Sequence, residues 1–312
     1  MSAEARTAAA GAHHSAFVRA MPWLFVLIWS TGFVVARLAM PHAPPFGFLS
    51  YRFALSALCL TAWVAIARAA WPASRAQWGH LLVTGVLMQA GYLGGVWAAV
   101  KAGLGAGTAA LLVGLQPVLT AVWMSRGGRG ADTDGISSQQ WLGLALGFFG
   151  LALVVWRKLG GEVTPVNLAL AIVALLSITI GTLYQKRFVG RCDVRSASSV
   201  QMVAALVVCL PLAWLESEKV EWHADLVAAM AWSVGVLTLG GSSLLYLLIQ
   251  RGEATRVTSL LYLVPPCTAL LAWAMFGESL TPLMMLGMAL TVVGVALVVR
   301  RRGEEELKER PT

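Results

Sequence analysis

Long apolar runs separated by short polar breaks dominate the chain. The runs approach the ~20 residues that a helix needs to cross a bilayer, and none alternates with period two as barrel strands do. The pattern therefore predicts an all-α integral membrane protein with ten transmembrane helices. The expected spans are 22–40, 47–68, 79–100, 104–125, 140–156, 166–185, 197–215, 226–249, 255–276 and 282–299.

Composition supports a membrane protein and excludes several other classes. Hydrophobic residues make up 58% of the 312 residues and charged residues only 12%, against about 25% charged in a soluble domain. A soluble enzyme, a disordered chain and a disulfide scaffold are thereby excluded. The polar N-terminal segment has no clear cleavage site before the first apolar run, so we expect that run to be retained. The net charge of +8 forms no basic face, so we expect no nucleic-acid partner.

Basic residues indicate how the spans are oriented. Most lysines and arginines lie in the N-terminal segment, in every second loop and in the C-terminal tail, and Arg52 lies within a span. The opposite side holds only Arg37, Lys101, Arg157, Lys158 and Lys219. Because cytoplasmic segments carry the excess of basic residues, we expect both termini to be cytoplasmic.

The two halves of the chain repeat each other. A shift of 149 residues pairs Gly32 with Gly181, Gly91 with Gly240 and Pro117 with Pro266, and a shift of 144 aligns the fifth helix of each half. We expect a cytoplasmic tail (1–20), two five-helix repeats (21–158 and 159–301) and a charged tail (302–312). Since five is odd, the second repeat is inverted in the membrane, which favours a transporter that works by alternating access.

Several short motifs resemble a known family in their order and spacing. They are Trp29–Arg37 (WSTGFVVAR), Tyr51-Arg-Phe53, residues 106–112 (AGTAALL) before Pro117, and Phe276-Gly-Glu-Ser279. Over about residues 20–300 the chain resembles the EamA family of the drug/metabolite transporter superfamily. The resemblance implies export or exchange of small metabolites, including amino acids, across the bacterial inner membrane. We expect Glu278 to serve as an anion near the N-terminus of the tenth helix.

Substrate sites of inverted repeats lie near the midplane between the halves. Gln89, Leu93 and Trp97 form a stripe that the shift of 149 carries onto Thr238, Ser242 and Tyr246, and an intramembrane arginine such as Arg52 is a functional candidate by default. Pro117 and Pro266 occupy equivalent mid-helix places and are candidate gate elements or static kinks. The predicted cavity residues are Trp29, Ser30, Arg52, Gln89, Tyr92, Trp97, Thr179, Gln201, Thr238, Ser242 and Tyr246.

Competing functions find less support. The histidines show no ligand spacing and no serine has a plausible catalytic partner, so neither a membrane-embedded enzyme nor a metal site is expected; a receptor would give no reason for the duplication. We expect no cofactor, and as partners only the lipid bilayer and a small-molecule substrate, with the chain a monomer or a weak homodimer. All acidic residues lie in termini, loops or span edges, which favours a facilitator or exchanger. The alternative is a proton-coupled exporter of cationic drugs or of other metabolites such as sugars, with His80 as the titrating group.

Overall fold

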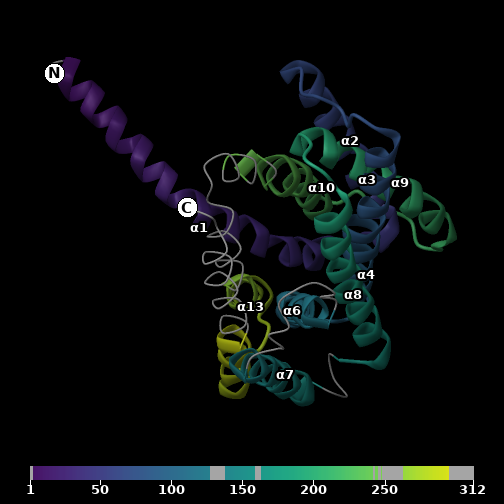
Figure 1. The fold of residues 1–312 in the computed structure, drawn as a ribbon. Helices are drawn as coiled ribbons and strands as arrows, with labels where there is room; N and C mark the ends of the chain where they lie inside the picture. Colours follow the sequence, from purple (N-terminus) through teal and green to yellow (C-terminus); the bar gives the residue numbers. More distant parts are fainter. Residues whose placement is uncertain are drawn as a thin grey trace.

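The computed structural model describes residues 3–126, 138–158, 163–241, 243–244, 247 and 263–294. Every labelled element within these ranges is helical, and Figure 1 shows their arrangement. The helices of the first half are α1 (Ala3–Ala39), α2 (Pro45–Ala67), α3 (Arg75–Gly85), the π-helix η1 (Val86–Gly91), α4 (Tyr92–Lys101), α5 (Ala106–Val113), α6 (Gln116–Arg126) and α7 (Ser138–Lys158). Those of the second half are α8 (Pro165–Phe188), α9 (Val194–Leu215), α10 (Ala224–Ala231), the π-helix η2 (Trp232–Gly240), α13 (Val264–Phe276) and a last helix, Pro282–Gly294.

Length and composition qualify four of the described helices to cross a bilayer. They are Pro45–Ala67, the combined Arg75–Lys101, Pro165–Phe188 and Val194–Leu215. Six shorter apolar helices each overlap one of the remaining predicted spans. Large apolar side chains on the long helices point outward, with Ile66 84% and Leu215 83% exposed, as a lipid-facing surface requires. The all-α membrane fold predicted from the sequence is confirmed.

Local sequence explains where several helices begin. Proline occupies the first turn of α2 and α8, where its missing N–H costs no hydrogen bond. Thr164 forms a capping box with Asn167, and the Ser74 side chain accepts a hydrogen bond from the Gln77 N–H at 3.2 Å. One element departs from the prediction. Helix α1 already begins at Ala3, inside the segment expected to be a polar tail, because that segment is rich in alanine, the strongest helix former.

The contacts between helices follow the repeat. Helix α4 packs on α8, and the equivalent segment η2 packs on α1; η1 packs on α9, and η2 on α2; α5 and α6 pack on α8, and α13 on α1. The equivalent pairs α2/α9 and α5/α13 pack on each other. Each contact thus has its counterpart under exchange of the halves, as a pseudo-two-fold axis between them produces, and one buried core runs through both halves.

Small residues bring the fifth helix of each half together. A Cβ atom added at Gly150 of α7 would collide with the carbonyl oxygen of Gly287 and with Thr291, both in the last helix. Glycine is therefore required there by the close approach of the two backbones, as expected for membrane helices.

Candidate functional site

A line of buried side chains on α2 connects the two halves. Phe48 stacks on Trp97 of α4 with ring centroids 4.5 Å apart. One turn further, the Arg52 guanidinium lies 5.8 Å from the centre of the same Trp97 ring. After another turn, the Ser56 hydroxyl donates to Thr238 Oγ1 of η2 at 3.3 Å. The structure thus brings Arg52, Trp97 and Thr238 of the predicted cavity into one continuous face.

Arg52 has no anionic partner among the described residues. Its side chain is 7% exposed, and its Nε atom is buried without a hydrogen-bond acceptor. The Trp97 ring face attracts the cation, and the Tyr92 phenol lies within electrostatic range of it. A charged arginine at a helix centre costs about 2.5–3.5 kcal/mol, and a single ring face offsets only part of that. A buried guanidinium in this setting is suited to receive an anion.

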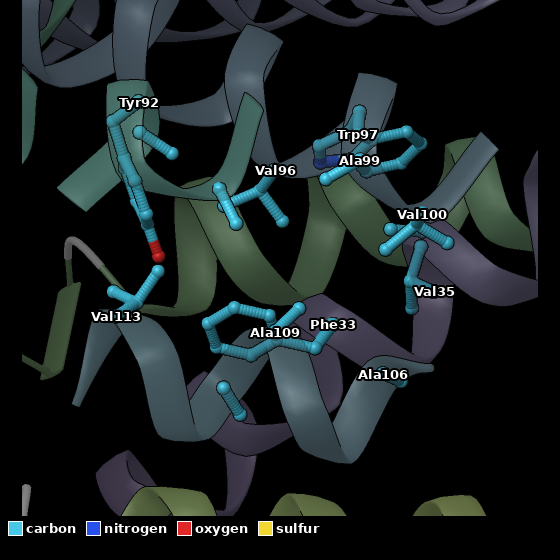
Figure 2. Close-up of a cluster of buried hydrophobic side chains, with 14 of the residues drawn as sticks. Phe33, Val35, Tyr92, Val96, Trp97, Ala99, Val100, Ala106, Ala109 and Val113 are labelled. Atoms are coloured by element: carbon cyan, nitrogen blue, oxygen red, sulfur yellow. The ribbon is translucent and has the colours of Figure 1, made fainter. Parts of the chain in front are cut away.

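Aromatic and aliphatic side chains surround this face. Figure 2 shows Tyr92 and Trp97 of α4, with the Tyr92 hydroxyl directed at Val113 of α5. Tyr92 is 8% and Trp97 1% exposed. The region around Arg52 is thus dry and apolar, which strengthens any charge interaction made there.

Both third helices of the repeat contain a π-helical segment. The segment η1 ends at Gly91 and η2 ends at Gly240, which the shift of 149 pairs. Gln89 lies in η1 and is half-buried, whereas Thr238 lies in η2 and donates to the Ser233 carbonyl, five residues back, at 3.0 Å. Such segments are rare and frequently occur at functional sites. The sequence analysis missed them because no residue type marks a π-helix as glycine marks a turn.

Other predicted cavity residues serve packing in this structure. The Ser30 hydroxyl donates to the Val26 carbonyl at 2.8 Å, and the Ser30 carbonyl accepts from Thr268 Oγ1 at 3.0 Å, which joins α1 to α13. The Thr179 hydroxyl donates within its own helix to Leu175. Trp29 is 39% exposed and lies beside Phe25.

Gln201 is buried at the contact of α9 with α3, and Ser242 and Tyr246 lie outside the described residues. A Cβ atom at Gly85 of α3 would come 2.6 Å from the Gln201 carbonyl oxygen. The backbone of Gln201 therefore forms the closest part of this contact between the halves.

The two prolines begin helices where mid-helix kinks were expected. Pro117 is the second residue of α6, and residues 114–115 form a turn that separates α6 from α5. Pro266 lies in the first turn of α13. Proline has no N–H to give to the preceding turn, so the fourth span is divided in two. Gly114 at that division approaches Pro265 so closely that a Cβ atom would lie 2.8 Å from its ring.

Glu278 corrects a sequence expectation. Its carboxylate accepts the N–H groups of Ala106 at 2.8 Å and of Gly107 at 3.4 Å, so it caps α5 and not the last helix. Glu216 acts in the same way on α2, accepting from Phe46 at 3.0 Å and from Gly47 at 2.8 Å. Each carboxylate neutralises the positive end of a helix in the opposite half. Two charges thereby join the halves at one end of the bundle.

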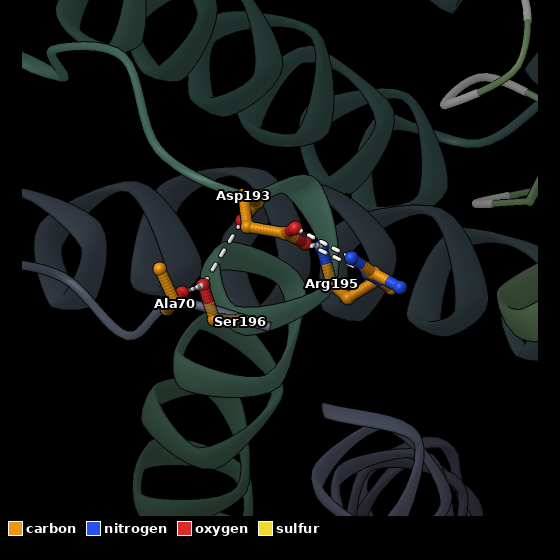
Figure 3. A network of polar contacts seen from close by, with 4 residues as sticks. All are labelled: Ala70, Asp193, Arg195 and Ser196. Atoms are coloured by element: carbon orange, nitrogen blue, oxygen red, sulfur yellow. Dashed lines mark hydrogen bonds and ion pairs between the residues drawn. The ribbon is translucent and has the colours of Figure 1, made fainter. Parts of the chain in front are cut away.

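A matching contact lies at the other end of the same two helices. The Ser196 hydroxyl, in the first turn of α9, donates to the Ala70 carbonyl at 2.9 Å, and Asp193 caps the helix while binding Arg195 (Figure 3). The segment after α2 thus covers the start of α9, and the segment after α9 covers the start of α2.

A hollow of about 470 Å³ lies at the end of the bundle where Glu216 and Glu278 act. None of the predicted cavity residues lines it. Its charged or titratable lining residues are Arg37, His42, Lys101 and Asp225. The predicted cavity residues around Arg52 are instead packed into the core, so access to Arg52 requires the helices to separate.

Two repeats of apolar helices, packed about a pseudo-two-fold axis with an arginine buried between them, define a multi-pass membrane transporter and not an enzyme. The model of the EamA-like transporter family matches residues 21–156 and again residues 166–300. The chain belongs to this family, as its resemblance predicted.

Similar proteins are also transporters. The uncharacterized transporter YvbV of Bacillus subtilis is 26% identical over 88% of each chain. A probable amino-acid metabolite efflux pump of Salmonella typhimurium is 26% identical over 88% of this chain and 92% of its own. A protein crystal structure with a TM-score of 0.61 and 18% identity covers 91% of this chain and 97% of the other, and shows the same fold.

Proposed function

We propose that the protein exports small metabolites that carry a carboxylate, amino acids above all, across the bacterial inner membrane by alternating access. The carrying observation is the buried Arg52, which lies over Trp97 without a carboxylate partner among the described residues. A guanidinium binds a carboxylate through two parallel hydrogen bonds, and the aromatic surroundings suit an apolar side chain. The name of the Salmonella relative supports the same substrate class.

The symmetry of the contacts supports alternating access. Two similar halves with opposite orientation can exchange conformations at little energetic cost, which opens the site to one side and then to the other. The π-segments pack against α9 and α2 of the opposite halves, where such an exchange would separate them. The excess of basic residues places both termini in the cytoplasm in this proposal.

The alternative, a proton-coupled exporter of cationic drugs, fits these contacts less well. A buried guanidinium repels a cationic substrate in a medium of low dielectric constant. No Asp or Glu is buried among the described residues, so the carboxylate that proton-driven carriers commonly use is not found there. The remaining titrating candidate, His80, hydrogen-bonds Tyr184 through Nδ1 at 2.8 Å. We therefore favour facilitated transport or exchange.

A binding assay on the purified protein tests the role of Arg52. Phenylalanine and leucine should bind, while phenylalaninamide, which lacks the carboxylate, should bind at least about tenfold more weakly, since a lost charged hydrogen bond costs roughly 1.5–3 kcal/mol. Arg52→Gln should remove this discrimination, and Arg52→Lys should restore part of it. The control is Arg75→Gln, which changes an exposed arginine at the start of α3.

Transport in proteoliposomes then tests the coupling. Phenylalanine loaded inside should equilibrate without an imposed pH gradient. Equal binding of phenylalanine and phenylalaninamide would contradict the carboxylate proposal, and accumulation abolished by a protonophore would contradict facilitation.

A further inference from the structure

Two histidines and an aspartate from opposite halves meet beside the hollow. His42 lies in the segment between α1 and α2, and His223 and Asp225 lie at the start of α10. The imidazole rings stack with centroids 4.5 Å apart. The Asp225 Oδ2 atom lies 3.8 Å from His42 Nε2 and 3.4 Å from His223 Nδ1. One ligand atom from each residue falls within 4.8 Å of the others.

Backbone hydrogen bonds hold this cluster in place. The Glu221 N–H donates to the His42 carbonyl at 2.9 Å, and the His223 N–H donates to the Glu221 carbonyl at 2.9 Å. His223 also caps α10, its Nδ1 accepting from the Asp225 N–H at 3.3 Å. The two segments are therefore already joined before any ligand binds, and the side chains need only small rotations to converge.

The donor set of the cluster suits a transition metal. Two imidazole nitrogens and one carboxylate oxygen are the ligands of open zinc sites, in which water completes the tetrahedron. Mg²⁺ and Ca²⁺ instead prefer sites made of oxygen alone. His42 and Asp225 line the 470 Å³ hollow, which gives an ion and its water access. Of the two cations that line the same hollow, Lys101 is paired with Glu218, and Arg37 remains as an opposing charge.

We propose that His42, His223 and Asp225 bind a divalent transition-metal ion of the zinc class, which clamps the two halves together at this end of the bundle. Because His42 belongs to the first half and the other two ligands to the second, the bound ion crosses the contact that must open during alternating access. The ion would hold this end closed. This inference rests on the fold and the cluster alone and does not depend on the substrate.

Zinc binding to the full chain, purified without a histidine tag, tests the site. His13→Ala/His14→Ala is the background, because two adjacent imidazoles in the N-terminal segment could bind zinc themselves. Titration calorimetry should give one Zn²⁺ per chain. His42→Ala, His223→Ala and Asp225→Asn should each weaken binding by at least about tenfold, since even outer ligand partners cost that much. His80→Ala is the matched control and should bind as the background does, and Mg²⁺ should not compete.

The clamp has its own readout. Zn²⁺ should raise the thermal unfolding temperature of the background protein and leave that of His42→Ala unchanged, because ligand binding stabilises the state that it binds. Three results would overturn the inference: no binding at micromolar Zn²⁺, equal binding by the three ligand variants, or binding without a shift in unfolding temperature. Folding of the variants is checked by their unfolding temperature without metal, which should match the background because His223 and Asp225 are exposed and His42 is only half-buried.

Discussion

Two glycines of α3 allow the contact between the halves to be measured. A Cβ atom at Gly85 would lie 2.6 Å from the Gln201 carbonyl oxygen, 2.7 Å from its Cα atom and 2.9 Å from Ala204 Cβ. The first two are backbone atoms of α9, so α3 and α9 must separate by roughly 1 Å. Overpacking of this kind costs about 1–3 kcal/mol. Gly79, in the same helix, has nothing within 4 Å of its Cβ position.

Alanine at either position gains the same helix propensity, about 0.5–1 kcal/mol. We therefore expect Gly85→Ala to be less stable than Gly79→Ala by about 1–3 kcal/mol, with Gly79→Ala equal to or more stable than the parent. Equilibrium unfolding in mixed detergent and SDS micelles measures the difference directly. Equal unfolding free energies for the two variants would refute the close contact of α3 with α9 and, with it, this part of the two-fold packing.

Three further predictions test other parts of the structure. Glu216→Gln should lower stability by about 1–2 kcal/mol, because it removes a charge at the start of α2, whereas Glu221→Gln should not, as unfolding of the pair will measure. The Arg195 side-chain hydrogen bond holds the pKa of the Asp193 carboxyl below its usual value, so its stabilisation is complete above about pH 4 and is lost as the pH falls through the lowered pKa; Asp193→Asn should flatten the dependence of unfolding on pH in that range. Reporter fusions at Gly128 and Gly161 should indicate opposite sides of the membrane, and equal signals would contradict the predicted orientation.

The features predicted from the sequence are those that depend on local pattern. The helical membrane fold follows from long apolar runs, and the duplication from a constant register of 149 residues. These survive in a single sequence because hydrophobicity is averaged over each span. The divided fourth span was harder to predict, since Pro117 is compatible with a kink as well as with a new helix start.

The features that sequence analysis missed depend on contacts between distant residues. Glu278 lies next to Thr281 and Pro282 in the chain, and this proximity suggested the wrong helix; in space the start of α5 is within its reach. His42 and His223 belong to different halves and have no spacing that a motif could record. Tertiary packing alone brings such groups together.

The symmetry of the repeat is broken at the position where the proposed site needs it to be. Arg52 and Gln201 are equivalent under the shift of 149, and both are buried, on the paired helices α2 and α9. A second arginine at position 201 would double the cost of burying a charge in the membrane, about 2.5–3.5 kcal/mol for each, and the two cations would repel each other in the same core. One amino acid presents one carboxylate, so one guanidinium is sufficient to bind it. A fold duplicated for movement can therefore keep two similar halves while only one of them carries the charge that binds the substrate.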